Sequence, residues 1–493
     1  MKKNSTSSAN SITASYEQNL ENIKNEFGNF SDLIIREFKI GPKKDIRAFL
    51  VMIDGLVDKL VINEHILKPL MKDTFLYQNQ QYTSQDLYQF VKECILYSHC
   101  ITEESNYAKT IHCILCGDVA LFVDGIDRAL LVSVRGWESR GIEEPNTEVV
   151  VRGPREGFTE NLRTNTALIR RKIRDPKLKI ESMKIGRISK TDIAICYIES
   201  IAKKELVDEV KRRLEKIDMD YILESGYIEA FIEDGKYSIF STVGNSEKPD
   251  VVVGKLMEGR VAILVDGTPF AITVPYLFVE AFQTSEDYYS RPYYYSIVRL
   301  LRYFSFFVST TLPAIYIAIT TFHQELLPTS LLISIASAQA GIPFPSSVET
   351  LTMLLIYEIL KEAGVRLPRP VGQAISIVGA LVIGDAAVSA GLIGAPMVVT
   401  VAFTAISTFM IPAISDACTI IRFACVIMAS ICGLYGIMLV WILMLIHLCH
   451  LKSFGVNFFA PIAPTILHDL KDIFVRFPWR ILKKRPIVFT KKF

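Results

Sequence analysis

The distribution of charge along the chain constrains its fold more than any other feature. Charged residues are frequent in residues 1–302, whereas residues 303–451 carry only a handful of them. Of the 493 residues, 50% are hydrophobic and 22% are charged, which is more apolar surface than an average soluble domain needs. The asymmetry predicts a soluble region joined to a membrane region. A formal net charge of only +2 argues against a strongly basic nucleic-acid binder, so we expect no nucleic-acid partner.

A repeated pattern divides the soluble region into two parts. Residues 119–125 and 261–267 are apolar runs that end in Asp-Gly, and each precedes a second apolar run, which is typical of a β-hairpin with a tight Asp-Gly turn. A strand and then a helix are predicted upstream of each hairpin. We therefore expect two related α+β subdomains at 29–150 and 151–286, on the cytosolic side, after a disordered polar tail at 1–28.

A basic helix is predicted where the second subdomain begins. It starts at Thr159 or Glu160 and ends before Pro176. One of its faces is apolar, and the other carries arginines gathered toward the C-terminus, where cations favour the helix dipole. Two interpretations remain open: an electrostatic latch between subdomains or neighbouring subunits, and a capped surface helix. The candidate interface residues are Arg152, Glu160, Asn165, Arg170 and Arg171.

Residues 300–451 are predicted to form an all-α polytopic membrane domain of four to five spans, after a Tyr-rich linker at 287–299. Asp416 and Arg422 are expected to mark a membrane edge. A short basic tail at 452–493 follows, and the positive-inside rule places it in the cytosol. The strong spans are predicted at 300–322, 371–392, 397–414 and 420–451. The number of crossings stays open, because counting 329–361 as a fifth span would export the tail.

The apolar run at 371–390 is unusual, because small residues recur in it every three or four positions. One interpretation is ordinary close packing of helices. The other is that several copies surround an axis and line a narrow lumen that gates by wetting and dewetting. Asp385 and Glu349 would be costly in lipid unless they are protonated, paired or facing water. The candidate pore-lining or gating residues are Gln373, Ser376, Ile377, Ala380, Asp385 and Glu349.

The sequence offers no catalytic constellation, since it lacks a Gly-rich phosphate loop, a nucleophile elbow and paired histidines at metal spacing. We therefore expect neither an enzyme nor a bound cofactor. A zinc site could in principle form from His99, Cys100, His112, Cys113 and Cys116. Reduced structural thiols in a cytosolic domain are favoured instead, so no metal is expected.

Many ordered blocks of the chain resemble the A subunits of spore germinant receptors, the GerA family of membrane proteins in spore-forming Bacillus-type bacteria. The resemblance extends from about residue 30 to 460. The blocks include Val151-Arg152-Gly153-Pro154, Glu156-Gly157-Phe158-Thr159-Glu160, Asn165-Thr166-Ala167-Leu168-Ile169-Arg170, Asp287-Tyr288-Tyr289, Phe322-His323-Gln324-Glu325-Leu326-Leu327-Pro328 and Pro343-Phe344-Pro345.

The resemblance implies a subunit of a nutrient-sensing receptor in the inner membrane of the spore. Its implied partners are a transporter-like B subunit, which binds the nutrient, a lipoprotein C subunit and membrane lipid. The resemblance also implies assembly into a homo-oligomer, a pentamer, that forms a nutrient-gated cation channel lined by the helix at 371–390. Relatives often have Gln where this chain has Asp385, so the residue is either a charge that raises cation selectivity or a protonated, hydrogen-bonded group.

Two other functions remain open. One is that of the related accessory membrane protein of dipicolinic-acid release, which shares the same blocks. The other is a nonconducting scaffold that recruits the other receptor subunits. The sequence identifies neither the sensed nutrient nor the stoichiometry.

Overall fold

The computed structural model describes residues 11–28, 30–40, 46–72, 85, 88–89, 101–134, 136, 148, 150–366, 384–482 and 484–490. The chain forms two compact units. The N-terminal unit comprises Met1–Glu233, Val243–Pro275 and Phe489–Phe493, and the helical unit comprises Asp234–Thr242 and Tyr276–Val488.

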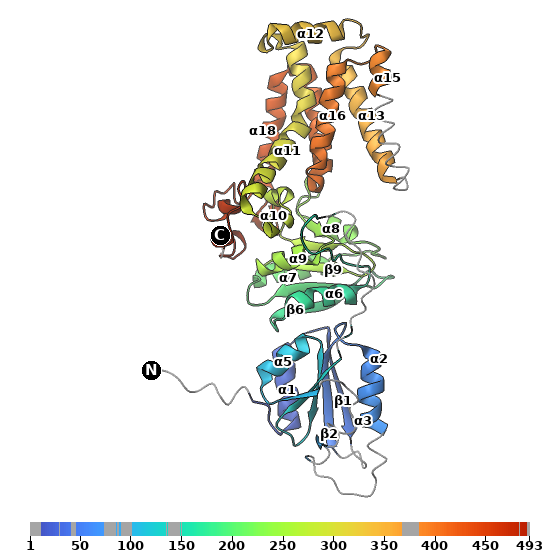
Figure 1. Cartoon of the computed structure of the whole chain (residues 1–493), viewed down its shortest axis with the longest axis vertical. Coiled ribbons are helices and arrows are strands. Elements are labelled where there is room, and N and C mark those ends of the chain that lie inside the picture. The colour runs from blue at the N-terminus through green and yellow to red at the C-terminus, as the bar shows by residue number, and fades with distance from the viewer. Residues whose placement is uncertain are drawn as a thin grey trace. The chain divides into compact units, whose positions relative to one another are not determined.

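Two five-stranded antiparallel sheets with the same strand order form the N-terminal unit (Figure 1). The first sheet has the order β1-β2-β4-β5-β3, and the second has the order β6-β7-β9-β10-β8. The α+β class expected for this region is confirmed. The strands are β1 (Leu33–Ile40), β2 (Ile46–Ile53), β3 (Ile101–Glu104), β4 (Asp118–Val123), β5 (Ala129–Ser133), β6 (Leu178–Ile185), β7 (Thr191–Ile198), β8 (Gly244–Ser246), β9 (Val261–Val265) and β10 (Ala271–Val274).

Helices cover both faces of the first sheet, because neighbouring residues of its central strands point to opposite sides. Phe49 and Phe122 pack with α1 (Tyr16–Phe27) and α5 (Tyr107–Leu115). Leu50 and Leu121 pack on the other face with the continuous helical segment of α2 (Lys59–Val61), the π-helical turn Ile62–Leu67 and α3 (Lys68–Lys72). The second sheet carries α6 (Leu162–Lys172), α7 (Lys204–Glu215), α8 (Ser225–Ile232) and α9 (Pro249–Met257).

The expected hairpins are present, but their loops are longer than a tight two-residue turn. In the first hairpin Leu121 pairs with Leu130, and in the second Leu264 pairs with Ala271. Gly125 and Gly267 have φ values of +85° and +89°, which glycine adopts without strain.

The aspartate of each Asp-Gly turn accepts a hydrogen bond from the first residue of a helix. The backbone N–H of Tyr16 donates to Asp124 Oδ1 at 3.3 Å, and that of Leu162 donates to Asp266 Oδ1 at 3.0 Å. The equivalent contacts make α1 the counterpart of α6 in the first subdomain.

The disordered tail expected at 1–28 is wrong for residues 16–27, which form α1. Tyr16, Leu20, Ile23 and Phe27 recur at helical spacing and are all buried in the core of the first subdomain. Only one residue in three or four of this helix faces the sheet, so these four apolar residues change the polar average composition of residues 1–28 very little.

The helical unit is built around α11 (Pro292–Thr321), which packs on α16 (Ala395–Phe409) and α17 (Ser415–Cys432). Among the described residues of this unit, two helical stretches, Pro292–Thr321 and Pro412–Cys432, are long and apolar enough to cross a membrane. The other α-helices are α10 (Glu286–Tyr289), α12 (Thr329–Gln339), α13 (Ser346–Arg366), α15 (Gly384–Ser389), α16 (Ala395–Phe409), α17 (Ser415–Cys432), α18 (Leu434–His450) and α19 (Ile487–Thr490), with a short ribbon of β11 (Lys452–Ser453) and β12 (Val456–Asn457).

Two segments of this unit differ from the sequence-based expectation. The single span expected at 420–451 consists of α17 and α18, which break at Gly433, a residue with φ of +60°. Much of the Tyr-rich linker expected at 287–299 is helical, because Pro292 is the first residue of α11 and its fixed φ suits that position.

Candidate functional site

A fully buried arginine lies at the centre of the helical unit. The Arg422 side chain on α17 donates from Nε to the carbonyl oxygen of Ser309 at 2.7 Å and from Nη2 to Thr408 Oγ1 at 2.7 Å. Its third contact is an ion pair of 3.1 Å between Nη1 and Glu358 Oε1. These residues, called the Arg422 cluster below, come from α11, α13, α16 and α17.

Arg422, which was expected to mark a membrane edge, has its side chain enclosed between helices with an exposed fraction of 0%. Removing a cation from water is costly unless a charge and further acceptors compensate it, and the cluster supplies both. Glu358 also accepts a hydrogen bond from Thr419 Oγ1 at 3.2 Å and forms an ion pair with Lys361 Nζ at 3.4 Å. The cluster can therefore hold four helices in one arrangement.

Glu349 and Asp385 lie in different environments. Glu349 is 2% exposed, and its Oε1 accepts a hydrogen bond of 2.5 Å from the backbone N–H of Gly394, the residue before α16. Asp385, on α15, is exposed. Among the residues that the structure describes, no hydrogen bond or ion pair joins the two carboxylates. Gln373, Ser376, Ile377 and Ala380 lie outside the described residues.

Arg170 on α6 links the two subdomains of the N-terminal unit. It forms a bidentate ion pair with Asp32, with Nε–Oδ2 at 2.9 Å and Nη2–Oδ1 at 3.0 Å, and both side chains are 1% exposed. Its Nη1 donates to the carbonyl oxygen of Leu178 at 2.8 Å. Burial raises the pKa of the neighbouring Cys196 thiol to about 12, so this cysteine stays protonated and unreactive.

Asn165 and Arg171, also expected at this interface, contact residues of the second subdomain. Asn165 Oδ1 accepts from the backbone N–H of Thr159 at 2.8 Å, and Nδ2 donates to the Thr159 carbonyl at 2.5 Å. Arg171 Nη2 lies 3.5 Å from Glu156 Oε1, within the same subdomain. Arg152 and Glu160 are exposed, and the Glu160 carbonyl accepts from the backbone N–H of Gly267 at 2.8 Å.

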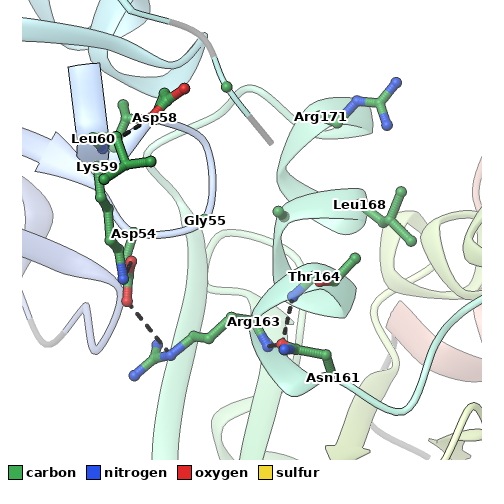
Figure 2. Close-up of a pocket in the computed structure, with 13 residues that line it drawn as sticks. Asp54, Gly55, Asp58, Lys59, Leu60, Asn161, Arg163, Thr164, Leu168 and Arg171 are labelled. Atoms are coloured by element: carbon green, nitrogen blue, oxygen red, sulfur yellow. Dashed lines mark hydrogen bonds and ion pairs between the residues drawn. The ribbon is translucent and has the colours of Figure 1, made fainter. Parts of the chain in front are cut away.

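A cleft of about 470 Å³ opens between α6 and the loop that joins β2 to α2. Figure 2 shows Asp54 and Arg163 pointing toward one another across it, with Nε–Oδ2 at 3.6 Å. Lys59 Nζ lies 2.8 Å from the other oxygen of Asp54. The charged residues that line the cleft are Asp54, Asp58, Lys59, Arg163 and Arg171. Gly55 has φ of +86°, and a Cβ there would lie 3.1 Å from the Arg163 carbonyl oxygen, so the loop and helix approach closely.

His112 and Cys116, two of the residues weighed for a zinc site, lie on and just after α5, with 3.7 Å between Nε2 and Sγ. Within the described part of the chain no group of three or more metal-ligating side chains is close enough to hold a metal ion. His99 and Cys100 lie outside it.

Sequence reasoning missed the Arg422 cluster. Arg422 and Glu358 are 64 residues apart, and nothing in either local sequence indicates the other partner. The available signal was the charge itself, because an arginine seven residues into an apolar helix requires a buried partner.

The chain matches a family model described as "Bacillus/Clostridium GerA spore germination protein" over residues 21–488. Spore germination protein KA of Bacillus subtilis is 47% identical over 98% of this chain and 88% of its own length. The uncharacterized membrane protein YfkQ of Bacillus subtilis is 43% identical over 97% of this chain and 92% of its own length. Spore germination protein GerLA of Bacillus cereus is 40% identical over 95% and 94% of the two chains.

A solved structure also matches: the N-terminal domain of the A subunit of the Bacillus megaterium spore germinant receptor GerK3. It is 40% identical, and the match covers 54% of this chain and 97% of that chain with a TM-score of 0.43. The resemblance to germinant-receptor A subunits is thus confirmed by relatives that match along nearly the whole sequence. The chain belongs to the Bacillus/Clostridium GerA spore germination protein family.

Proposed function

We propose that the protein is a membrane subunit of a nutrient-sensing spore germination receptor, located in the inner membrane of the spore. It works with a nutrient-binding B subunit and a lipoprotein C subunit, and it assembles into a homo-oligomer, a pentamer, that conducts cations when nutrient is sensed. The family membership supports the receptor role.

The apolar exterior of the helical unit is the observation that carries the membrane location. Large apolar side chains are exposed on several of its helices, an arrangement that water disfavours and lipid favours. Val399, Phe403, Ile406 and Phe409 on α16 are 69%, 47%, 61% and 66% exposed, and Ile442, Leu443 and Ile446 on α18 are 50%, 58% and 61% exposed.

The break at Gly433 and the length of α13 together favour an even number of crossings. The helices α17 and α18 provide two crossings in place of the one expected at 420–451. The 21 residues of α13 extend about 30 Å at 1.5 Å per residue, which is enough to cross the membrane. With the sequence-predicted span at 371–392, we propose six crossings, through α11, α13, the 371–392 segment, α16, α17 and α18. Six crossings leave the N-terminal unit and the basic tail on the same, cytosolic, side.

We further propose that the segment at 371–390 lines the channel, with Gln373, Ser376, Ile377 and Ala380 toward the lumen. The exposed Asp385, within the described C-terminal part of this segment, supports the proposal, because a carboxylate on the outside of an apolar unit needs water or a second copy beside it. Glu349 is proposed to act at the gate through its hydrogen bond to Gly394.

Potassium release from spores tests the channel. Spores carrying Ile377→Ala or Ser376→Ala are compared with spores carrying Ile427→Ala, whose side chain is 50% exposed on α17, outside the 371–390 segment. A channel predicts that the first two variants leak or release early without nutrient while the control does not. Normal release from all three, at normal protein levels, would instead favour a nonconducting scaffold. Normal nutrient-triggered germination combined with a loss of dipicolinic-acid release would favour the accessory protein.

A further inference from the structure

The segment after α18 is fixed to the beginning of α11. Asp472 Oδ1 accepts from Arg299 Nη1 at 2.8 Å, and Oδ2 accepts from the Tyr288 hydroxyl at 2.6 Å. The backbone N–H of Arg476 donates to Ser296 Oγ at 3.1 Å. Arg299 is fully buried, so these contacts are sheltered from water and hold the segment firmly.

The outer face of this segment is aromatic, aliphatic and basic. Trp479 is 59% exposed, although its indole N–H is already used, since it donates to the Tyr288 carbonyl oxygen at 3.1 Å. Arg480 and Lys484 are exposed beside it in the sequence. We call these residues the tail patch: Phe474, Val475, Phe477, Trp479, Arg480, Ile481 and Lys484.

The first turns of α11 expose side chains of the same kind. Tyr293, Tyr294 and Ile297 are 80%, 63% and 59% exposed, and Phe304 further along the helix is 55% exposed. The contacts of Asp472 and Arg476 therefore hold the tail patch at the end of a candidate membrane span. At this end of α11 exposed tyrosines are followed along the helix by exposed aliphatic and phenyl side chains.

The chemistry of the tail patch favours a lipid surface over a protein partner. Amphipathic rings at the end of a span lie at the level of the lipid headgroups. Neighbouring lysines and arginines attract anionic headgroups, and an aromatic and basic segment that lies flat in the interface gains from both effects. A protein interface can have a similar aromatic and arginine composition, so the place of the tail patch, at the end of a candidate membrane span, is what favours lipid.

We propose that the tail patch binds the anionic phospholipid headgroups of the leaflet in which α11 begins. This inference rests on the membrane location proposed above. It implies that lipid binds to a C-terminal segment that Asp472 and Arg299 hold against the beginning of α11.

Tryptophan quenching in nanodiscs with the full chain tests the inference. The chain has three tryptophans, Trp137, Trp441 and Trp479. Trp137→Phe with Trp441→Phe leaves Trp479 as the reporter. Two kinds of phosphatidylcholine nanodisc are compared, with the same fraction of lipid brominated on the acyl chain. In the first kind the brominated lipid is phosphatidylglycerol, and in the second it is phosphatidylcholine. We expect several-fold stronger quenching by brominated phosphatidylglycerol.

Two further variants make the outcomes distinct. Adding Arg480→Gln and Lys484→Gln should abolish the preference for phosphatidylglycerol, whereas Arg174→Gln with Lys177→Gln, an exposed Arg and Lys pair of the N-terminal unit, should retain it. A reporter for the bundle, Ile442→Trp with all three native tryptophans replaced by Phe, monitors insertion itself.

If the Ile442→Trp reporter is quenched but Trp479 is not, or if Trp479 responds equally to both lipids, the lipid inference is overturned and the membrane location stands. If the Ile442→Trp reporter is not quenched, the membrane location is overturned, and the inference with it.

Discussion

Glu358 and Arg422 form an ion pair of 3.1 Å inside the helical unit, and the arginine has no exposed surface. Glu358→Gln would leave this cation uncompensated, and we expect the free energy of unfolding to fall by about 3–5 kcal/mol. Replacing both residues by Met should recover part of this loss, because no charge is then buried. Thermal unfolding of the purified protein in nanodiscs measures both effects.

Glu362→Gln is the matched control, since Glu362 pairs with Arg366 on the surface of the same helix at 2.6 Å with both side chains exposed. Such pairs contribute less than about 1 kcal/mol. Equal effects at Glu358 and Glu362 would contradict a structural role for the Arg422 cluster.

The bidentate pair of Asp32 and Arg170 leads to a similar prediction for the N-terminal unit. Asp32→Asn leaves a buried guanidinium against a neutral amide, and we expect a loss of about 3–5 kcal/mol together with faster hydrogen exchange in β1 and β6. Asp218→Asn serves as the comparison, because Asp218 pairs with Arg187 in solvent. If hydrogen exchange changed in only one of the two strands, Arg170 would not link the subdomains.

Local patterns in the sequence predicted much of the secondary structure. The Asp-Gly hairpins, the strand and helix upstream of each one and the apolar helix that begins near residue 300 follow from periodicity and turn residues. The pairs Asp32 with Arg170 and Glu358 with Arg422 could not be predicted, because a single sequence carries no record of contacts between residues 138 and 64 positions apart.

Helix α1 was missed although the sequence contained a signal for it. Thr13 and Asn19 have the same spacing as Thr159 and Asn165, so the repeat of the hairpins extends to the helices before them. Asn19 Nδ2 donates to the Thr13 carbonyl at 2.6 Å, as Asn165 Nδ2 does to Thr159 at 2.5 Å.

This equivalence predicts that Asn19→Ala and Asn165→Ala have similar costs. Each change removes a buried amide that satisfies two backbone groups, and we expect a loss of about 1–3 kcal/mol in thermal unfolding. Asn25→Ala, an exposed position on α1, should stay within about 0.5 kcal/mol. If the N-terminus were disordered, Asn19→Ala would change the stability as little as Asn25→Ala does.

Gly433 separates α17 from α18, and we expect Gly433→Ala to be destabilising. A Cβ there would lie 2.8 Å from Cε1 of His323 and 3.0 Å from Cβ of Phe322, and φ of +60° strains any L side chain. The loss should exceed about 1 kcal/mol in thermal unfolding. Gly254→Ala on α9 is the control, because a Cβ there meets nothing within 4 Å and alanine favours a helix. A neutral Gly433→Ala would mean that α17 and α18 join as one helix, which would remove one of the six proposed crossings.

Glu229 on α8 makes the stability of the N-terminal unit depend on pH. Burial raises the pKa of its carboxyl from 4.5 to about 7, with Asn245 opposing the shift and Glu224 and Glu233 adding to it. Between these values the folded protein holds a proton that the unfolded chain has lost, so stability falls as pH rises from 4.5 to 7, by at most about 1.4 kcal/mol per pH unit, and then levels off.

Glu229→Gln should remove this slope and make the protein more stable than the wild type above pH 7, with the difference vanishing toward pH 4.5. Glu209→Gln should act in the opposite direction. Burial raises the pKa of Glu209, but hydrogen bonds from Arg212 and Arg213 outweigh it and lower the pKa overall. The wild-type carboxylate at Glu209 therefore adds stability that is lost as pH falls through its pKa. Melting temperatures of wild type and Glu229→Gln between pH 4.5 and 7 measure the first slope, and those of wild type and Glu209→Gln below pH 4.5 measure the second. Parallel curves for wild type and Glu229→Gln would show that Glu229 titrates as an ordinary exposed carboxylate.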